Sequence, residues 1–301
     1  MNTKAIMNSE NSSRGLSLLY MYIGAGLISE YGIEGEAAVR RALAGFAVQR
    51  GEDLRKTHLS LGMKTNLYNV AKYYNGGYDE DTATEGSFYE VDPCRDSHDT
   101  TFCPFVKEMI DRGHRELAVA YCEEVHPPLW QSYAPTAIVN LGRTLAQEGS
   151  DRCYFDIFLR PARMTAEQRK ECFEEYDPDF KGDRHEEYRF PTHSESSKQQ
   201  TVFMLKSLAS EAQKAFGEDS LGCVKKAISA YLDDYLATLR ASAEENGLAF
   251  DEDFMRKNCL FAMSMEEDAG YWDRYGTPGL KALADRSIYA PLREKYRSMA
   301  E

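Results

Sequence analysis

The sequence predicts an α+β fold in which a helical hairpin packs on a small antiparallel sheet, followed by an all-helical C-terminal half that partly repeats the first helical unit. Three observations predict this class: helical periodicity near both ends of the chain, short β-favouring segments between them, and a self-match at an offset of 185 residues. The chain of 301 residues is long enough for two domains of ordinary size.

The first helical unit is predicted to be a hairpin of two amphipathic helices. Apolar residues recur at helical spacing across residues 16–30, and a second helical pattern runs from residue 34 to Gly62, where the glycine ends it. Residues 1–14 are polar and rich in Asn and Ser, so we expect a flexible leader there.

Short strands are predicted after the helical hairpin. Aromatic and β-branched residues favour strands, and they predict the segments 87–92, 100–102, 136–144 and 153–159. A helix is expected at 104–125 with a break at Gly113. We therefore expect residues 15–173 to form one α+β domain.

A polar stretch with prolines and a serine cluster, residues 174–197, is predicted to be a linker. The C-terminal domain, residues 198–301, has helical periodicity throughout and no convincing strand. The second half is therefore expected to keep the helices of the first unit without its sheet.

When the sequence is aligned with itself at this offset, Tyr31–Met63 aligns with Phe216–Leu248 without a gap. The identical pairs are Gly32 and Gly217, Val39 and Val224, Ala42 and Ala227, Leu54 and Leu239, Arg55 and Arg240, and Gly62 and Gly247. Any two amphipathic helices resemble each other at some offset, but the glycines that bracket both segments favour a duplication.

The acidic balance of the chain argues against two classes of partner. Asp and Glu number 49 against 36 Lys and Arg, and the net charge of −13 would repel nucleic-acid phosphates and anionic lipid. No apolar run reaches the ~20 residues of a membrane span, and the polar N-terminus is unlike a secretory signal. We expect a cytoplasmic protein, a monomer or homo-oligomer, that acts on a small molecule.

Seven cysteines without an export signal favour free thiols in a reducing compartment. Cys103 precedes Pro104, and proline is favoured at the first position of a helix. The Cys103 thiol is therefore predicted at a helix N-terminus, where backbone N–H groups and the helix dipole stabilise a thiolate. This makes it the best-placed nucleophile, and the alternative is that it only packs in the core.

Several short motifs follow one another in an order that can be compared with known families. They are the hairpin end at Arg55–Gly62, Asn66–Tyr68, Cys103–Phe105, Tyr121–Cys122 and the strand Gly149-x-x-x-Cys153-x-Phe155. Their joint order resembles the L-2-amino-thiazoline-4-carboxylic acid hydrolase family over about residues 17–159. The resemblance implies an α+β domain and, for the enzyme that names the family, hydrolytic opening of a cyclic thiazoline amidine in a bacterial route to cysteine.

Opening a cyclic amidine, imide or thiazoline needs attack on an electrophilic carbon and protonation of the departing atom. Cys103 is the candidate nucleophile, and His58 and His114 are candidate acid/base partners because imidazole titrates near neutral pH. His58 stands where the second copy has Ala243, so the hairpin does not require it. The alternatives are a surface histidine at position 58 and a helix cap or solvated side chain at position 114.

Further residues of this segment are candidate substrate contacts, namely Tyr68, Cys122, Glu123, Arg143 and Cys153. Arg143 could clamp a carboxylate through its guanidinium, and Glu123 could bind an ammonium group or orient a base. Ordinary surface pairing is the alternative for both. An aromatic pocket, or else simple packing, is expected from the tyrosine cluster Tyr68, Tyr73, Tyr74 and Tyr78.

A metal-dependent alternative uses three cysteines of the same segment. If Cys103, Cys122 and Cys153 converge, they could hold zinc and leave a fourth position for an activated water. Nothing in their spacing fixes that geometry, so no cofactor is expected.

The sequence therefore predicts a hydrolase that opens a small cyclic C–N substrate with a cysteine nucleophile. A non-catalytic small-molecule binding or sensor module is the main alternative, because a helical hairpin over a small sheet forms a pocket without an activated thiol. An enzyme of another class that acts on a small aromatic ligand is a third hypothesis.

Overall fold

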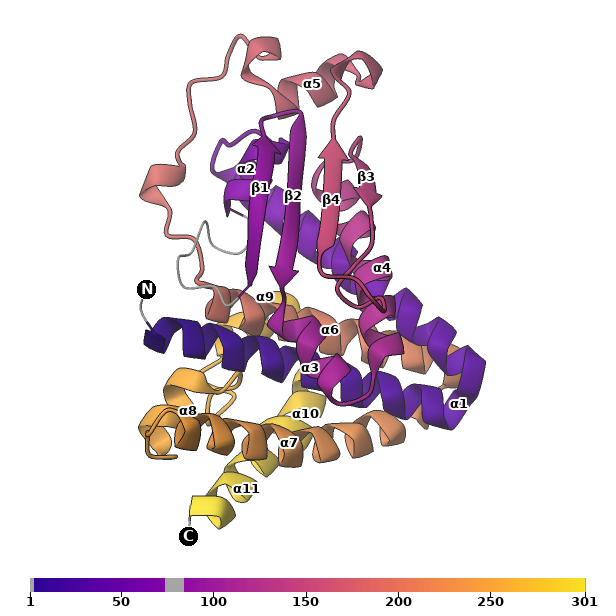
Figure 1. Cartoon of the computed structure of the whole chain (residues 1–301), viewed down its shortest axis with the longest axis vertical. Coiled ribbons are helices and arrows are strands. Elements are labelled where there is room, and N and C mark those ends of the chain that lie inside the picture. Colours follow the sequence, from indigo (N-terminus) through magenta and orange to yellow (C-terminus); the bar gives the residue numbers. More distant parts are fainter. Residues whose placement is uncertain (1–2, 74–83, 301) are drawn as a thin grey trace.

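A computed structural model describes residues 3–73 and 84–300 of the chain (Figure 1). In chain order the helices and strands are α1 (Thr3–Ser60), α2 (Leu67–Tyr73), β1 (Glu85–Val91), β2 (Arg95–Phe102), α3 (Pro104–Asp111), α4 (Arg115–Tyr133), β3 (Ile138–Leu141), β4 (Cys153–Phe158), α5 (Ala166–Cys172), α6 (His193–Phe216), α7 (Ser220–Glu245), α8 (Glu252–Asn258), α9 (Ala269–Tyr275), α10 (Pro278–Ala284) and α11 (Ala290–Ala300). The predicted α+β class is confirmed.

Helix α1 is bent sharply at Gly32, whose φ of 59° lies in the left-handed region that glycine adopts without steric cost. The bend divides α1 into an N-terminal arm, residues 3–31, and a C-terminal arm, residues 33–60 (Figure 1). The expectation of a flexible leader at 1–14 is wrong for residues 3–14, which continue the N-terminal arm. Polar helix contacts hold this stretch, because the hydroxyl of buried Ser12 lies 2.9 Å from that of Ser194 in α6.

The four strands form one antiparallel sheet in the order β1-β2-β4-β3. In its centre, β2 pairs with β4 so that His98 lies opposite Phe155 and Thr100 opposite Cys153. The four predicted strand positions are confirmed, although β2 begins earlier than expected, at Arg95. Cys153, Phe155 and Ile157 are buried on the face covered by α4, while Tyr154 is exposed on the other face.

Helix α1 lies at the centre of the molecule and packs against α3, α4, α6 and α7. One continuous hydrophobic core runs from Leu16 in α1 to Tyr296 in α11, so it crosses the predicted boundary between the two halves. Among the described residues, α1 is the one helix long and apolar enough to cross a membrane. Its apolar residues Leu18, Leu19 and Ile23 are fully buried here, which is the arrangement of a core helix in a soluble protein.

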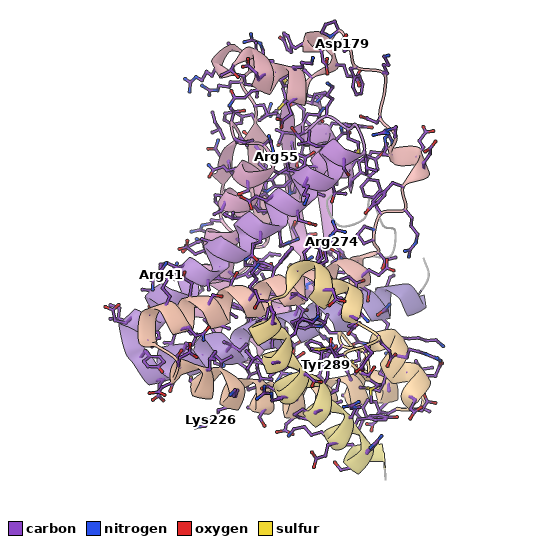
Figure 2. All side chains as sticks on the ribbon, turned by 180° about the vertical axis from the view of Figure 1, so that it is seen from behind. Arg41, Arg55, Asp179, Lys226, Arg274 and Tyr289 are labelled. Carbon is purple, nitrogen blue, oxygen red and sulfur yellow. The ribbon has the colours of Figure 1, made fainter. Side chains whose placement is uncertain are left out.

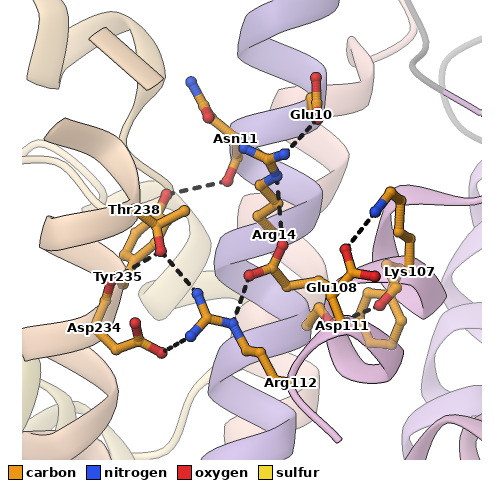
Figure 3. Close-up of polar contacts among 12 residues, drawn as sticks. Glu10, Asn11, Arg14, Lys107, Glu108, Asp111, Arg112, Asp234, Tyr235 and Thr238 are labelled. Carbon is orange, nitrogen blue, oxygen red and sulfur yellow. Dashed lines mark hydrogen bonds and ion pairs between the residues drawn. The ribbon is translucent and has the colours of Figure 1, made fainter. Parts of the chain in front are cut away.

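A polar network ties α3 to both α1 and α7 (Figure 3). Arg112, just after α3, donates to Glu108 at 2.7 Å, to Thr238 at 3.0 Å and to Asp234 of α7. Glu108 also pairs with Arg14 of α1 at 3.4 Å. The middle of the family-like segment, at α3, is therefore bonded directly to the C-terminal half.

The break predicted in the helix after Cys103 is confirmed at Gly113, which has a φ of 79° between α3 and α4. The predicted linker, residues 174–197, contains two short 3-10 helices, and α6 already begins at His193. Thr192 caps α6 with a capping box to Glu195, a local signal that the polar composition of the stretch concealed. Beyond it, the regular structure of residues 198–300 is helical, as predicted.

Candidate functional site

Helix α4 places three side chains, spaced four residues apart, on its face toward the sheet. The Cys122 thiol hydrogen-bonds Cys153 of β4. One turn later, the His126 ring packs edge-on against Phe155 with a centroid distance of 4.9 Å. Another turn later, the ring centroid of Trp130 lies 6.4 Å from that of His98 in β2. The helix and the two central strands thus enclose one cluster, which we call the thiol site.

Cys153 accepts two hydrogen bonds in this site. The Cys122 thiol is one donor, and the backbone N–H of Leu145, in the β3–β4 connection, is the other at 3.2 Å from Sγ. Both bonds stabilise a thiolate and together they hold the pKa of Cys153 below its ordinary value, although burial opposes them. The same bond to Cys153, together with burial, raises the pKa of Cys122 well above its ordinary value.

Cys103 lies at the N-cap of α3 with Pro104 at the next position, so its predicted place at a helix N-terminus is confirmed. The expected low pKa is wrong. Burial raises the pKa of the Cys103 thiol to about 11, and the backbone N–H groups of Val106 and Phe105 offset this only in part. Cys103 is also close enough to Cys153 for the charge of one to disfavour the charge of the other.

A histidine and an aspartate that the sequence analysis missed lie beside these thiols. His98 Nδ1 is 2.8 Å from Asp96 Oδ1, and the Asp96 side chain is fully buried. The His98 ring stacks on Phe155 with a centroid distance of 4.6 Å. An Asp-x-His pattern on an alternating strand was the available signal, because residues two apart on a strand share a face.

His126 completes the buried ring cluster around Phe155. Its pKa falls to about 3, chiefly because burial disfavours the imidazolium and secondarily because Arg50 is positive. His126 is therefore a neutral ring near physiological pH and fits packing or hydrogen bonding better than proton transfer.

The structure does not bring the predicted acid/base partners to Cys103. His58 is fully buried, so the surface alternative is wrong, and its Nδ1 lies 2.7 Å from the hydroxyl of Tyr133. The rings around it, those of Tyr73, Tyr133 and Phe190, are separate from the thiol site. His114 is half-buried at the N-cap of α4 and makes no side-chain capping bond.

Of the predicted substrate contacts, only Cys122 and Cys153 lie in the thiol site. Glu123 is bonded to Arg40 of α1 at 3.3 Å on an exposed helix face, as the surface alternative predicted. Arg143 is exposed in the β3–β4 connection. Tyr68 is exposed on α2, where Lys72 covers its ring. Tyr74 and Tyr78 lie outside the described residues.

The three thiols of the zinc alternative do converge, because Cys122 contacts Cys153 and both interact electrostatically with Cys103. However, within residues 3–73 and 84–300 no group of three or more His, Cys, Asp or Glu side chains is arranged to hold a metal ion.

The two buried histidines predict acid sensitivity of the fold. Burial lowers the pKa of His58 to about 4 and that of His126 to about 3, so the unfolded chain takes up protons below pH ~6.5 that the folded chain does not. The free energy of unfolding keeps its full value above that pH. It falls as the pH drops towards 4, and each histidine lowers it by about 2 kcal/mol at pH 5. Urea unfolding at pH 7 and pH 5 measures this loss.

A His126→Gln variant is expected to halve the difference in unfolding free energy between pH 7 and pH 5, because it removes one of the two proton acceptors. An unchanged pH dependence in that variant would assign the acid sensitivity to other groups.

Comparison with known proteins adds one result to this geometry. Residues 19–157 match the family model described as L-2-amino-thiazoline-4-carboxylic acid hydrolase. Neither a search of curated proteins nor a search of solved structures returned a match. The matched range contains α3, α4 and the whole thiol site, and it agrees with the resemblance read from the motifs. Residues 19–157, somewhat less than half of the chain, are therefore similar to the L-2-amino-thiazoline-4-carboxylic acid hydrolase family, a family of hydrolases.

Proposed function

We propose that this protein is a hydrolase that opens a small cyclic C–N compound with Cys153, rather than Cys103, as the nucleophile. The family match supports hydrolysis of a cyclic thiazoline-type substrate. We propose that the ring is an amidine, an imide or a thiazoline, and that Cys153 attacks it.

One observation supports Cys153 above the other thiols. Of the seven cysteines, all within the described residues, Cys153 alone has a lowered pKa. The pKa is raised for each of the other six, which are Cys94, Cys103, Cys122, Cys172, Cys223 and Cys259. Since the thiolate is the reactive form, Cys153 is the thiol best prepared for attack.

His98 is the proposed acid/base group. It lies opposite Phe155, and Cys153 lies two residues before Phe155 on the same face of β4. His98 and Cys153 are thus diagonal neighbours, a relation that separates residues by about 7 to 8 Å and leaves room for a reacting atom between them. Asp96 binds Nδ1 and so directs the other ring nitrogen, as a carboxylate does in nucleophile–base–acid triads.

One buried polar atom at this site, Asp96 Oδ2, is without a hydrogen-bond partner among the described residues. Unsatisfied buried polar atoms carry a free-energy cost and are uncommon in native structures. A polar group of a small ring compound could donate a hydrogen bond to Asp96 Oδ2. Arg143, the residue before Thr144, is the proposed contact for a substrate carboxylate.

The proposed reaction proceeds in two displacements. The Cys153 thiolate forms a bond to the carbon of the ring C–N bond, that bond breaks, and the nitrogen leaves with the electron pair and takes a proton from His98. A water molecule then loses a proton to His98 and attacks the same carbon, and the C–S bond breaks to return the thiolate. His98 and Cys153 end in their starting forms, with one water consumed.

Alkylation by iodoacetamide tests the assignment without knowledge of the substrate. At pH 7 we expect Cys153 to be carboxamidomethylated faster than any other cysteine, because its pKa is lowered and the others are raised. Peptide mass mapping after short exposures measures the order of labelling. Preferential labelling of Cys103, or equal slow labelling of all seven, would contradict the proposal.

A further inference from the structure

The thiol site holds two cysteines in direct contact. Cys122 lies on the face of α4 toward the sheet, and its thiol donates a hydrogen bond to Cys153 of β4. Both side chains are buried and belong to the same hydrophobic core. A disulfide joins sulfur atoms about 2.05 Å apart. Side chains that already bring their sulfur atoms together meet the first requirement for such a bond.

The two sulfur atoms are not equivalent. Hydrogen bonds from the Cys122 thiol and from the backbone N–H of Leu145, 3.2 Å away, lower the pKa of Cys153. The bond to Cys153 and burial raise the pKa of Cys122. A thiolate attacks a peroxide, and a neighbouring thiol then resolves the oxidised sulfur. The contact therefore pairs an attacking sulfur, Cys153, with a resolving sulfur, Cys122.

Cys122 becomes more reactive once Cys153 has been oxidised. The largest cause that raises the pKa of Cys122 is its bond to Cys153, and a sulfenic acid at position 153 no longer carries the negative charge that this bond stabilises. The hydroxyl of Thr144, in the β3–β4 connection, also bonds the Cys122 sulfur and favours its thiolate. The first oxidation thus prepares the second sulfur for attack.

A third thiol, that of Cys103, is less suited to this role. Cys103 interacts with Cys153 through charge rather than through a hydrogen bond. Burial raises the pKa of Cys103 to about 11, and the backbone N–H groups of Val106 and Phe105 lower it only in part. Cys122 is therefore the expected partner of Cys153, and a link to Cys103 is the alternative that an experiment must separate.

We propose that hydroperoxides convert Cys122 and Cys153 into a disulfide and that small thiols reverse it, so that oxidation reversibly switches off the thiol site. The inference rests on the proposed function in one respect, because the disulfide occupies the sulfur that is proposed to attack the substrate. Hydrogen peroxide is the smallest oxidant of this class, so a site that admits a ring compound admits it as well.

The oxidation takes two steps. The Cys153 thiolate attacks one oxygen of hydrogen peroxide, an S–O bond forms, the O–O bond breaks, and hydroxide leaves with the electron pair and is protonated to water. Cys122 then loses its proton and forms an S–S bond to Cys153, while the S–O bond breaks and the second hydroxide takes up that proton. The two sulfurs lose two electrons and the peroxide becomes two waters. Two molecules of glutathione return these electrons by thiol–disulfide exchange.

Peptide mapping of the full chain after exposure to an equimolar amount of hydrogen peroxide tests the proposal. We expect a linked pair of peptides that contain Cys122 and Cys153, lighter by two hydrogens than the sum of the two and separated again by dithiothreitol. Alkylation of Cys153 by iodoacetamide should fall at least about tenfold after the peroxide and return after reduction, because a disulfide has no free thiolate.

Cys122→Ser removes the resolving sulfur but keeps a hydroxyl that can donate to Cys153. Peroxide should then give no disulfide, and Cys153 should accumulate as sulfenic acid, which dimedone traps, and as sulfinic acid, which dithiothreitol does not reduce.

Cys223→Ser is the matched control, and it should form the Cys122–Cys153 disulfide as the unchanged protein does. Cys223 lies in α7, one turn before Lys226. Figure 2 shows Lys226 among the C-terminal helices, and Arg55, which bonds the last residue of α4, towards the other end of the molecule.

The proposal is overturned if peroxide leaves Cys122 and Cys153 as free thiols, or if it links Cys153 to Cys103 instead. If Cys122→Ser fails to fold, the map of the unchanged protein decides alone. Formation of the disulfide in a protein whose Cys153→Ala variant still hydrolyses its substrate would support the disulfide and refute the proposed nucleophile. Loss of hydrolysis in Cys153→Ala without any disulfide in the oxidised protein would refute this inference and leave the proposed function standing.

Discussion

Replacement of Cys153 by alanine is expected to abolish the proposed hydrolysis of a cyclic thiazoline-type substrate, with a loss in kcat of roughly 10³-fold or more. The physical reason is that no second thiol at the site has a lowered pKa, so none is prepared to replace it. The rate at which the ring-opened product appears at saturating substrate measures the effect.

The matched control is Cys103→Ala, which removes a neighbouring, partly buried thiol whose pKa is about 11. It should retain kcat within about tenfold while losing packing free energy comparable to that lost in Cys153→Ala, about 1 kcal/mol for so small a side chain. If kcat instead collapses in Cys103→Ala and is retained in Cys153→Ala, the nucleophile is Cys103 at the N-terminus of α3.

Gly51→Ala is expected to destabilise the fold by about 3 kcal/mol, a large effect for one methyl group. A Cβ at position 51 would lie 2.4 Å from the carbonyl oxygen of Leu129 and 2.8 Å from Cβ of Ser132, so α1 and α4 would have to separate. Backbone atoms cannot move aside as a flexible side chain can. Urea unfolding at pH 7 measures the change in unfolding free energy.

Gly222→Ala is the control for helix propensity. Gly222 lies in α7 with no atom within 4 Å of an added Cβ, so alanine there should stabilise the fold by up to about 1 kcal/mol. If both variants gain stability, α1 and α4 do not pack through Gly51. If Gly51→Ala is the destabilised one, its kcat should fall too, because α4 carries Cys122 over Cys153.

Local patterns predicted most of the fold. Aromatic and β-branched residues located the strands, and glycines marked the turns at Gly32, Gly113 and Gly62, all three of which have positive φ. Hydropathy missed the first turns of α1, because residues such as Ser12 and Ser13 are buried through hydrogen bonds to α6 rather than through apolar contact. The predicted linker at 174–197 runs into α6, because the capping box of Thr192 and Glu195 starts that helix at His193.

The site was only partly predictable, since its chemistry depends on distances between elements far apart in the chain. The position of Cys103 was right, but its pKa depends on burial that no local pattern reports. Cys153 gains its thiolate character from Cys122, 31 residues away, and from a backbone N–H in an irregular connection. Asp96 and His98 were passed over because only the strand register brings them beside Cys153.

The central position of α1 has a consequence for the order in which the protein can fold during synthesis. The N-terminal arm is made first, yet Ser12, Ser13 and Gly15 find their partners only in α6 and α7, about 180 to 220 residues later. The part of the arm that packs on α6 and α7 therefore stays uncovered until those helices are made, a situation that favours capture by chaperones. A chain released after α5 would contain every residue of the thiol site. It would lack α6 and α7, against which the first helix packs.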